Sequence, residues 1–168
     1  IDTKEQTLVL EHSLVSIAKW ESNWHETFLG NKGFQDSSED NFKKYKGYIR
    51  CMTITKNVQD DTFDIIIKSK ALTKQIQDYI DDPMTATWFS NEPRRPAKEV
   101  ITSELIYYWM IAYGIPFECQ KWHINRLLTL IRICSIKQEK EKKMSKSQTA
   151  ASNRSLNAAR RAKMHSRG

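Results

Sequence analysis

Large apolar side chains become scarce after Ile136, and this change limits what the chain can fold into. Before it, leucine, isoleucine and aromatic residues recur at helical spacing. Beyond it, the large apolar residues are Met144, Leu156 and Met164. Each side chain of this size contributes about 1.5–3 kcal/mol when buried, so three of them do not fix the C-terminal residues on a core. We therefore predict a body over residues 1–136 and an arm over residues 137–168.

The positive charge follows the same division. The net charge is +7, and residues 137–168 hold ten Lys or Arg against the two acids Glu139 and Glu141. Residues 1–136 are then almost neutral, with 17 basic and 18 acidic groups. The basicity therefore describes the arm and does not indicate a nucleic-acid-binding body.

The body is predicted to be a small, mainly α helical bundle. Thr7 to Glu11 reads as a short extended segment. Ser13 is a plausible N-cap for a helix that buries Leu14, Ile17, Trp24 and Phe28 and is stopped by Gly30, Asn31 and Gly33. Ser37-Ser38-Glu39-Asp40 opens a second helix with Phe42, Tyr45, Ile49 and Met52 on one face.

A weaker helix spans Leu72 to Ile80. Thr62 to Ile67 stays undecided because its β-branched run is short. Three prolines make Asp81 to Lys98 irregular.

An antiparallel helical hairpin is predicted to form the centre of this bundle. Lys98 to Tyr113 is apolar almost all round, which is typical of a central core helix. Gly114 suits the C′ position and Pro116 the first turn of a second helix that runs to about Cys134. In the arm, Lys140 to Lys146 reads as a charged hinge before a final Ala-rich helix from Ser145 to Met164.

The residue types that carry chemistry do not form a recognisable site. Cys119 and His123 are four apart on a predicted helix, but zinc takes four ligands, and Cys51 and Cys134 are not spaced as a second pair. The four histidines lack the local signatures of nucleophilic catalysis, and the five glycines form no phosphate-binding loop. We predict that the chain is not an enzyme and uses no metal or cofactor.

Binding is the remaining class of function. The second helix of the hairpin resembles a DNA-reading helix only weakly, through Lys121, Asn125, Arg126 and Arg132, and an ordinary hairpin explains these residues better. Aromatic residues exposed at a surface are favoured anchors in protein interfaces. The aromatic candidates for partner binding are Trp88, Phe89, Trp109 and Trp122, and the electrostatic candidates are Arg154, Arg160, Arg161 and Lys163. No apolar run approaches the roughly 20 residues that cross a bilayer, so we expect no membrane partner.

Several stretches resemble one family of tailed-bacteriophage proteins, the tail assembly chaperones. They are LEHSLVSIAKWESNWHETFL from Leu10, YIRCMTITKNV from Tyr48, MTATWFS from Met84 and ITSELIYYWMIAYGIPFECQKWHINRLLTLIRIC from Ile101, followed by the basic runs KKMSK and SNRSLNAARRAKM. The resemblance covers nearly the whole chain and brings no catalytic motif. Because the chain begins at Ile1 without Met, we expect it to come from a longer product.

The resemblance implies a chaperone that binds tape-measure or other tail proteins in the host cytoplasm during virion assembly. Self-association, and nucleic-acid binding through the arm, are further expectations. The alternative is a structural virion component, such as a connector, neck or head protein, whose basic arm touches DNA or a neighbouring subunit. A third interpretation is a phage DNA-binding regulator, whose DNA binding would be steeply salt-dependent.

Overall fold

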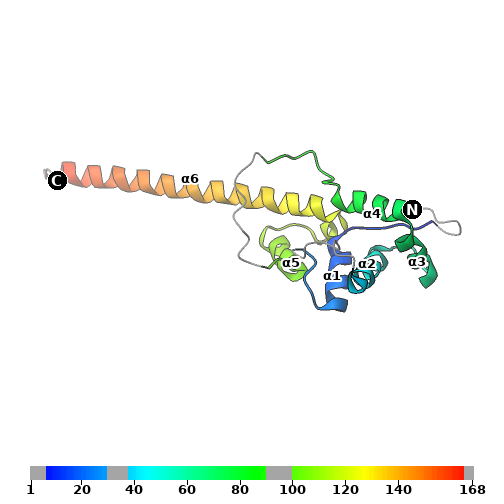
Figure 1. Cartoon of the computed structure of the whole chain (residues 1–168). Coiled ribbons are helices and arrows are strands. Elements are labelled where there is room, and N and C mark those ends of the chain that lie inside the picture. The colour runs from blue at the N-terminus through cyan, green and yellow to red at the C-terminus, as the bar shows by residue number, and fades with distance from the viewer. Residues whose placement is uncertain (1–6, 30–37, 90–99, 165–168) are drawn as a thin grey trace. The chain divides into compact units, whose positions relative to one another are not determined.

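The protein is mainly α-helical, as predicted (Figure 1). The computed structural model describes residues 7–29, 38–89 and 100–164. The helices are α1 (Leu14–Trp24), α2 (Glu39–Met52), α3 (Asp60–Lys68), α4 (Lys70–Asp81), α5 (Ser103–Ala112), the 3-10 helix η1 (Phe117–Lys121) and α6 (Ile124–Met164). Within these ranges no helix is both long enough and apolar enough to cross a bilayer.

The chain divides into two compact units. The first is Ile1–Ile131, which holds α1 to α5, η1 and the first turns of α6. The second is Arg132–Gly168, whose described part is the remainder of α6. Each unit is therefore described by itself.

The helix α1 lies at the centre of the first unit, where α2, α5 and η1 all contact it. Ser13 caps it as predicted, because its hydroxyl accepts a hydrogen bond from the Ser16 N–H. Leu14, Ile17 and Trp20 are almost completely buried. The predicted end of this helix at the Gly30 turn is wrong. The helix ends at Trp24, because His25 adopts a left-handed conformation with φ 53° and its N–H bonds to the Glu21 carbonyl.

The close approach of α1 and α2 depends on a glycine. A Cβ atom added at Gly47 would lie 3.0 Å from Trp24 Nε1 and 3.4 Å from another atom of the same indole. Ser38 caps α2 as predicted, and Glu39 and Asp40 occupy its first turn.

The undecided stretch Thr62 to Ile67 belongs to the helix α3. Its β-branched residues are accommodated because Phe63 and Ile66 are buried and Asp60 and Asp61 begin the helix. Ser69 then ends α3 and caps α4, because its hydroxyl accepts from the Leu72 N–H.

The extended segment at the N-terminus pairs with the residues that follow α2. The Glu11 N–H donates to the Met52 carbonyl at 2.8 Å, and the Ile54 N–H donates to the Val9 carbonyl at 2.9 Å. In the region predicted to be irregular, Asp81 still belongs to α4, residues 82–89 are irregular, and the remainder up to Lys98 lies outside the described residues.

The prediction that the first hairpin helix is a central core helix is wrong. Of the residues in α5, only Ser103, Ile106 and Met110 are buried, whereas Tyr108 is 63% and Ile111 65% exposed. The helix packs against α1 with one narrow face and lies at the surface of the unit.

The bounds predicted for the second helix of the hairpin, Pro116 and Cys134, are also both wrong. After the turn at Gly114, which has φ 64°, the chain forms η1, and α6 begins only at Ile124. The backbone is extended at Trp122 and His123 because His123 forms a β-bridge with Ser13. The helix then runs to Met164 without the predicted hinge or the separate arm helix.

Candidate interaction surfaces

A buried carboxylate attaches α5 to α1. Glu21 is 9% exposed. Its Oε2 accepts from the Ser103 N–H at 2.8 Å, and its Oε1 accepts from the Phe28 N–H at 2.8 Å. Because Ser103 is the first residue of α5, this carboxylate satisfies an N–H that the helix itself leaves free. The Thr102 hydroxyl caps the same end by accepting from the Leu105 N–H.

The face of α5 that is directed away from α1 is apolar near the C-terminal end of the helix. Glu104, Tyr108 and Ile111 follow at four- and three-residue spacing, which places them on one side of the helix. All three are exposed. Hydrogen bonds from the Glu104 backbone N–H and from the Thr102 hydroxyl lower the pKa of Glu104. The outer face of α5 therefore carries one carboxylate followed by two large exposed side chains.

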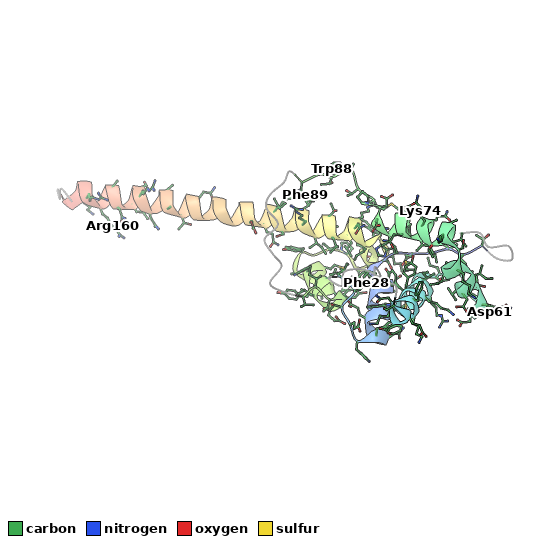
Figure 2. The ribbon with its side chains drawn as sticks, in the orientation of Figure 1. Phe28, Asp61, Lys74, Trp88, Phe89 and Arg160 are labelled. Atoms are coloured by element: carbon green, nitrogen blue, oxygen red, sulfur yellow. The ribbon has the colours of Figure 1, made fainter. Side chains whose placement is uncertain are left out.

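A second exposed apolar group lies on the segment between α4 and α5. Trp88 is 89% exposed, and Figure 2 shows it with Phe89 beyond the end of α4. The start of this segment is fixed by hydrogen bonds. Asn125 Nδ2 donates to the carbonyls of Ile80 at 3.1 Å and Asp82 at 2.8 Å, and Asp82 Oδ1 accepts from the Met84 N–H at 2.7 Å.

The four aromatic candidates from the sequence have different environments. Trp88 is exposed, and Phe89, Trp109 and Trp122 are half-buried. The Trp122 ring lies under the guanidinium of Arg126, with 4.2 Å between the Arg126 carbon and the ring centroid.

Around α5 and η1, sequence reasoning did not identify the exposed apolar residues Val100, Tyr108, Ile111 and Phe117. All four lie in the two helices predicted for the hairpin, where the nearly uniform apolar composition does not show which side faces outward. No signal in the sequence separates those residues from the buried Ile106 and Met110.

The electrostatic candidates all lie on α6. Arg154, Arg160, Arg161 and Lys163 are exposed, and Figure 2 shows Arg160 as a projecting side chain. The weak resemblance to a DNA-reading helix at the hairpin is not supported by the geometry, because Lys121 lies on η1 and Asn125 is bonded to the end of α4.

Two histidines meet two tyrosines in the interior. The His12 and His123 rings lie 4.8 Å apart between centroids, and His12 Nδ1 is hydrogen-bonded to the Tyr48 hydroxyl. Burial, and secondarily the charge of His123, lower the pKa of His12 to about 3. Burial raises the pKa of Tyr48 well above its ordinary value. His12 is therefore neutral at physiological pH.

The side chains of this histidine–tyrosine cluster are held by hydrogen bonds within the protein and do not form a metal site. His123 Nε2 donates to the Tyr79 carbonyl at 2.9 Å while its Nδ1 accepts from the Asn125 N–H at 3.3 Å, which assigns its proton to Nε2. Cys119 is buried on η1. Over residues 7–29, 38–89 and 100–164, no group of three or more His, Cys, Asp or Glu is placed to hold an ion.

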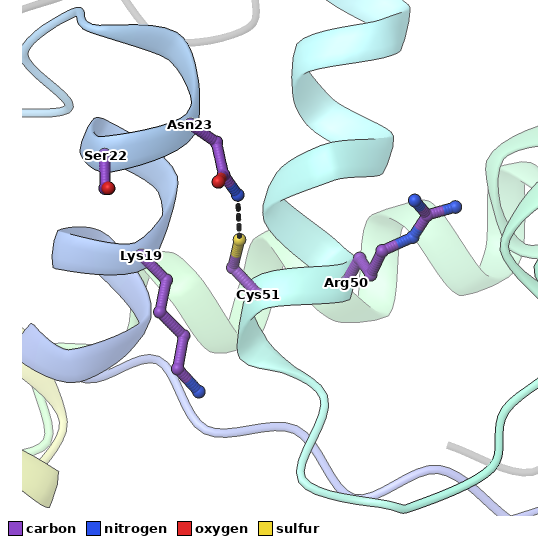
Figure 3. A pocket seen from close by; sticks show the side chains of 5 residues that line it. All are labelled: Lys19, Ser22, Asn23, Arg50 and Cys51. Carbon is purple, nitrogen blue, oxygen red and sulfur yellow. Dashed lines mark hydrogen bonds between the residues drawn. The ribbon is translucent and has the colours of Figure 1, made fainter.

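One concave feature of the described residues is a pocket between α1 and α2 (Figure 3). It is lined by Lys19, Ser22, Asn23, Arg50 and Cys51. Asn23 Nδ2 lies 3.8 Å from Cys51 Sγ. Burial raises the pKa of the Cys51 thiol against the opposing effects of Lys19 and the Asn23 hydrogen bond. A thiol with a raised pKa is a poor nucleophile. The Arg50 guanidinium is paired with Asp60.

Comparison with known proteins identifies no relative. No protein-family model, no curated protein and no solved structure matches the chain.

Proposed function

We propose that this chain is a non-catalytic tail assembly chaperone of a tailed bacteriophage, which binds tape-measure or other tail proteins in the host cytoplasm. The observation that carries the proposal is the group of large side chains exposed on α5 and on the segment between α4 and α5, of which Trp88 at 89% is the most exposed. The family resemblance of the sequence supplies the biological setting.

Exposed aromatic and aliphatic side chains fit a partner whose own apolar face must be covered. Trp88 and Tyr108 expose rings that bury a large area on contact. Ile111 extends the apolar part of the α5 face. A helix of the partner, with anchors three and four residues apart, matches such a surface.

The rigid attachment of α5 supports a binding role for its outer face. Glu21 and Thr102 fix the beginning of the helix, so Tyr108 and Ile111 are held in place before a partner arrives. Binding to a preorganised surface avoids part of the entropy cost of ordering side chains.

Co-expression with the tape-measure protein encoded by the same phage tests the proposal. The double variant Trp88→Ala, Tyr108→Ser is expected to recover at least tenfold less tape-measure protein in a pull-down, because truncation of an aromatic anchor typically costs 2 kcal/mol or more in binding. The matched control is Phe42→Ala, Ile65→Ser, which removes two exposed apolar side chains from α2 and α3. Equal recovery with both variants would remove this surface from the proposal.

The structural alternative is favoured by one observation, the exposed basic helix of the second unit. A connector, neck or head protein is a permanent part of the particle, whereas a chaperone leaves before maturation. Mass spectrometry of purified virions separates the two, and the chaperone proposal expects the chain to be absent.

A further inference from the structure

We propose that residues 148–164 of α6 bind duplex DNA by entering the major groove. This inference is independent of the chaperone surface on the first unit. It rests on the continuity of α6, the exposure of its C-terminal part, its charge and the arrangement of its side chains.

Residues 148–161 of α6 are not packed against a hydrophobic core. Every residue from 148 to 161 is exposed, and Leu156 is 53% exposed. Most helical stability in proteins comes from the packing of a helix against other elements. A helix with this composition therefore gains stability from a partner.

The positive charge of residues 148–164 indicates that their partner is a polyanion. Arg154, Arg160, Arg161 and Lys163 are exposed cations, and the sequence contains no Asp or Glu after Glu141. None of the residues three or four positions away from these four side chains along the sequence is an Asp or a Glu, so the helix supplies no such carboxylate to pair with them.

The side chains of one face are small. Ala151, Ser155 and Ala158 follow at four- and three-residue spacing and are all exposed. Arg154 and Arg161, seven residues apart, lie on one side of this face, and Lys163 lies on the other. Small side chains let the helix axis approach a surface closely, while the flanking cations reach outward on both sides.

This arrangement matches a groove better than it matches an acidic protein. An α-helix is about 10–12 Å in diameter, and the major groove of B-DNA is about 12 Å wide and bordered by phosphates on both sides. Continuous basic helices bind DNA in this way in several families. Residues 148–164 span about 25 Å at 1.5 Å per residue, so Arg154 and Arg161 lie about 10 Å apart along the axis.

The proposal also predicts which nucleic acid is preferred. The major groove of duplex RNA is deep and narrow and does not admit a helix. A helix that enters the groove should bind duplex DNA more tightly than duplex RNA of the same length. A helix that binds only through its charge should not discriminate between them.

Fluorescence anisotropy with the full chain and a labelled random-sequence 20-base-pair DNA tests the inference. Each phosphate contact contributes about 0.9 to the slope of log K against log salt. The triple variant Arg154→Gln, Arg161→Gln, Lys163→Gln is therefore expected to lower the slope by about 2.7 and to weaken binding at least tenfold. The control Lys68→Gln, Lys70→Gln, Lys74→Gln removes the same charge from exposed positions of α3 and α4. It should change neither the salt slope nor the affinity for DNA.

A second variant separates groove entry from simple attraction. Ala151→Leu with Ala158→Leu keeps the charge and the helix propensity but makes the small face bulky. Weaker DNA binding of at least tenfold supports entry. Unchanged binding of this variant, equal affinity for duplex RNA, or equal affinity for polyglutamate would each overturn the proposal.

Discussion

Protonation of His12 is the perturbation whose effect on stability follows most directly from the structure. His12 is 2% exposed, and its Nδ1 is hydrogen-bonded to the Tyr48 hydroxyl. The rings of Phe28, Tyr79 and His123 surround it, with centroids 6.2, 6.4 and 4.8 Å away. If the His12 imidazole were protonated, its positive charge would be buried. None of these neighbours is a carboxylate that could pair with it.

The direction of the pH effect follows from the lowered pKa. The pKa of His12 is about 3 in the folded protein and 6.5 when unperturbed. Between these values the unfolded chain binds a proton that the folded chain does not, so the stability present above pH 6.5 is lost as the pH falls. Each pKa unit is worth about 1.36 kcal/mol. Acidification to about pH 5 therefore removes roughly 2 kcal/mol of the free energy of unfolding through His12 alone.

Urea denaturation followed by tryptophan fluorescence at about pH 7.5 and pH 5 measures this loss. We expect His12→Gln to abolish most of the difference between the two pH values, because the amide accepts from Tyr48 but does not titrate. The control is His25→Asn, because His25 is exposed and Asn tolerates its left-handed backbone. The lowered pKa values of Asp64 and Glu104 act below this range. An equal pH dependence in the wild type and in His12→Gln would refute the reasoning.

Three further substitutions test the contacts that position the candidate surface, each by the urea midpoint. Glu21→Gln is expected to lose about 2 kcal/mol, because an amide accepts only through its oxygen and leaves either the buried Ser103 N–H or the part-buried Phe28 N–H unpaired. Gly47→Ala is expected to destabilise by about 1 kcal/mol, since the clash with the Trp24 indole outweighs the gain in helix propensity; a stabilised variant would contradict the close approach. Asn125→Ala is expected to lose about 1–2 kcal/mol and to speed hydrogen exchange near the end of α4.

The starts of α1 and α2 were predictable because their causes are local. The Ser13 and Ser38 hydroxyls each bond to an N–H three residues ahead, so the sequence alone contains both partners. The placement of α5 was not predictable, because a helix that is apolar on every side carries no periodicity to show which side is buried.

The break before α6 has a non-local cause. His123 is extended because it pairs with Ser13 from the start of the chain, and no pattern near residue 123 indicates that pairing. The role of Glu21 had a usable signal. It shares the three- and four-residue spacing of Leu14, Ile17 and Trp24, and a carboxylate within an apolar stripe requires buried donors.

Hydrogen–deuterium exchange on the full chain, with and without bound tape-measure protein, tests most directly whether the exposed apolar side chains of α5 and of residues 84–89 are the binding surface. The account predicts slower exchange in α5 and in residues 84–89, with little change in α3. Slower exchange confined to residues 132–164, or none in α5, would contradict it.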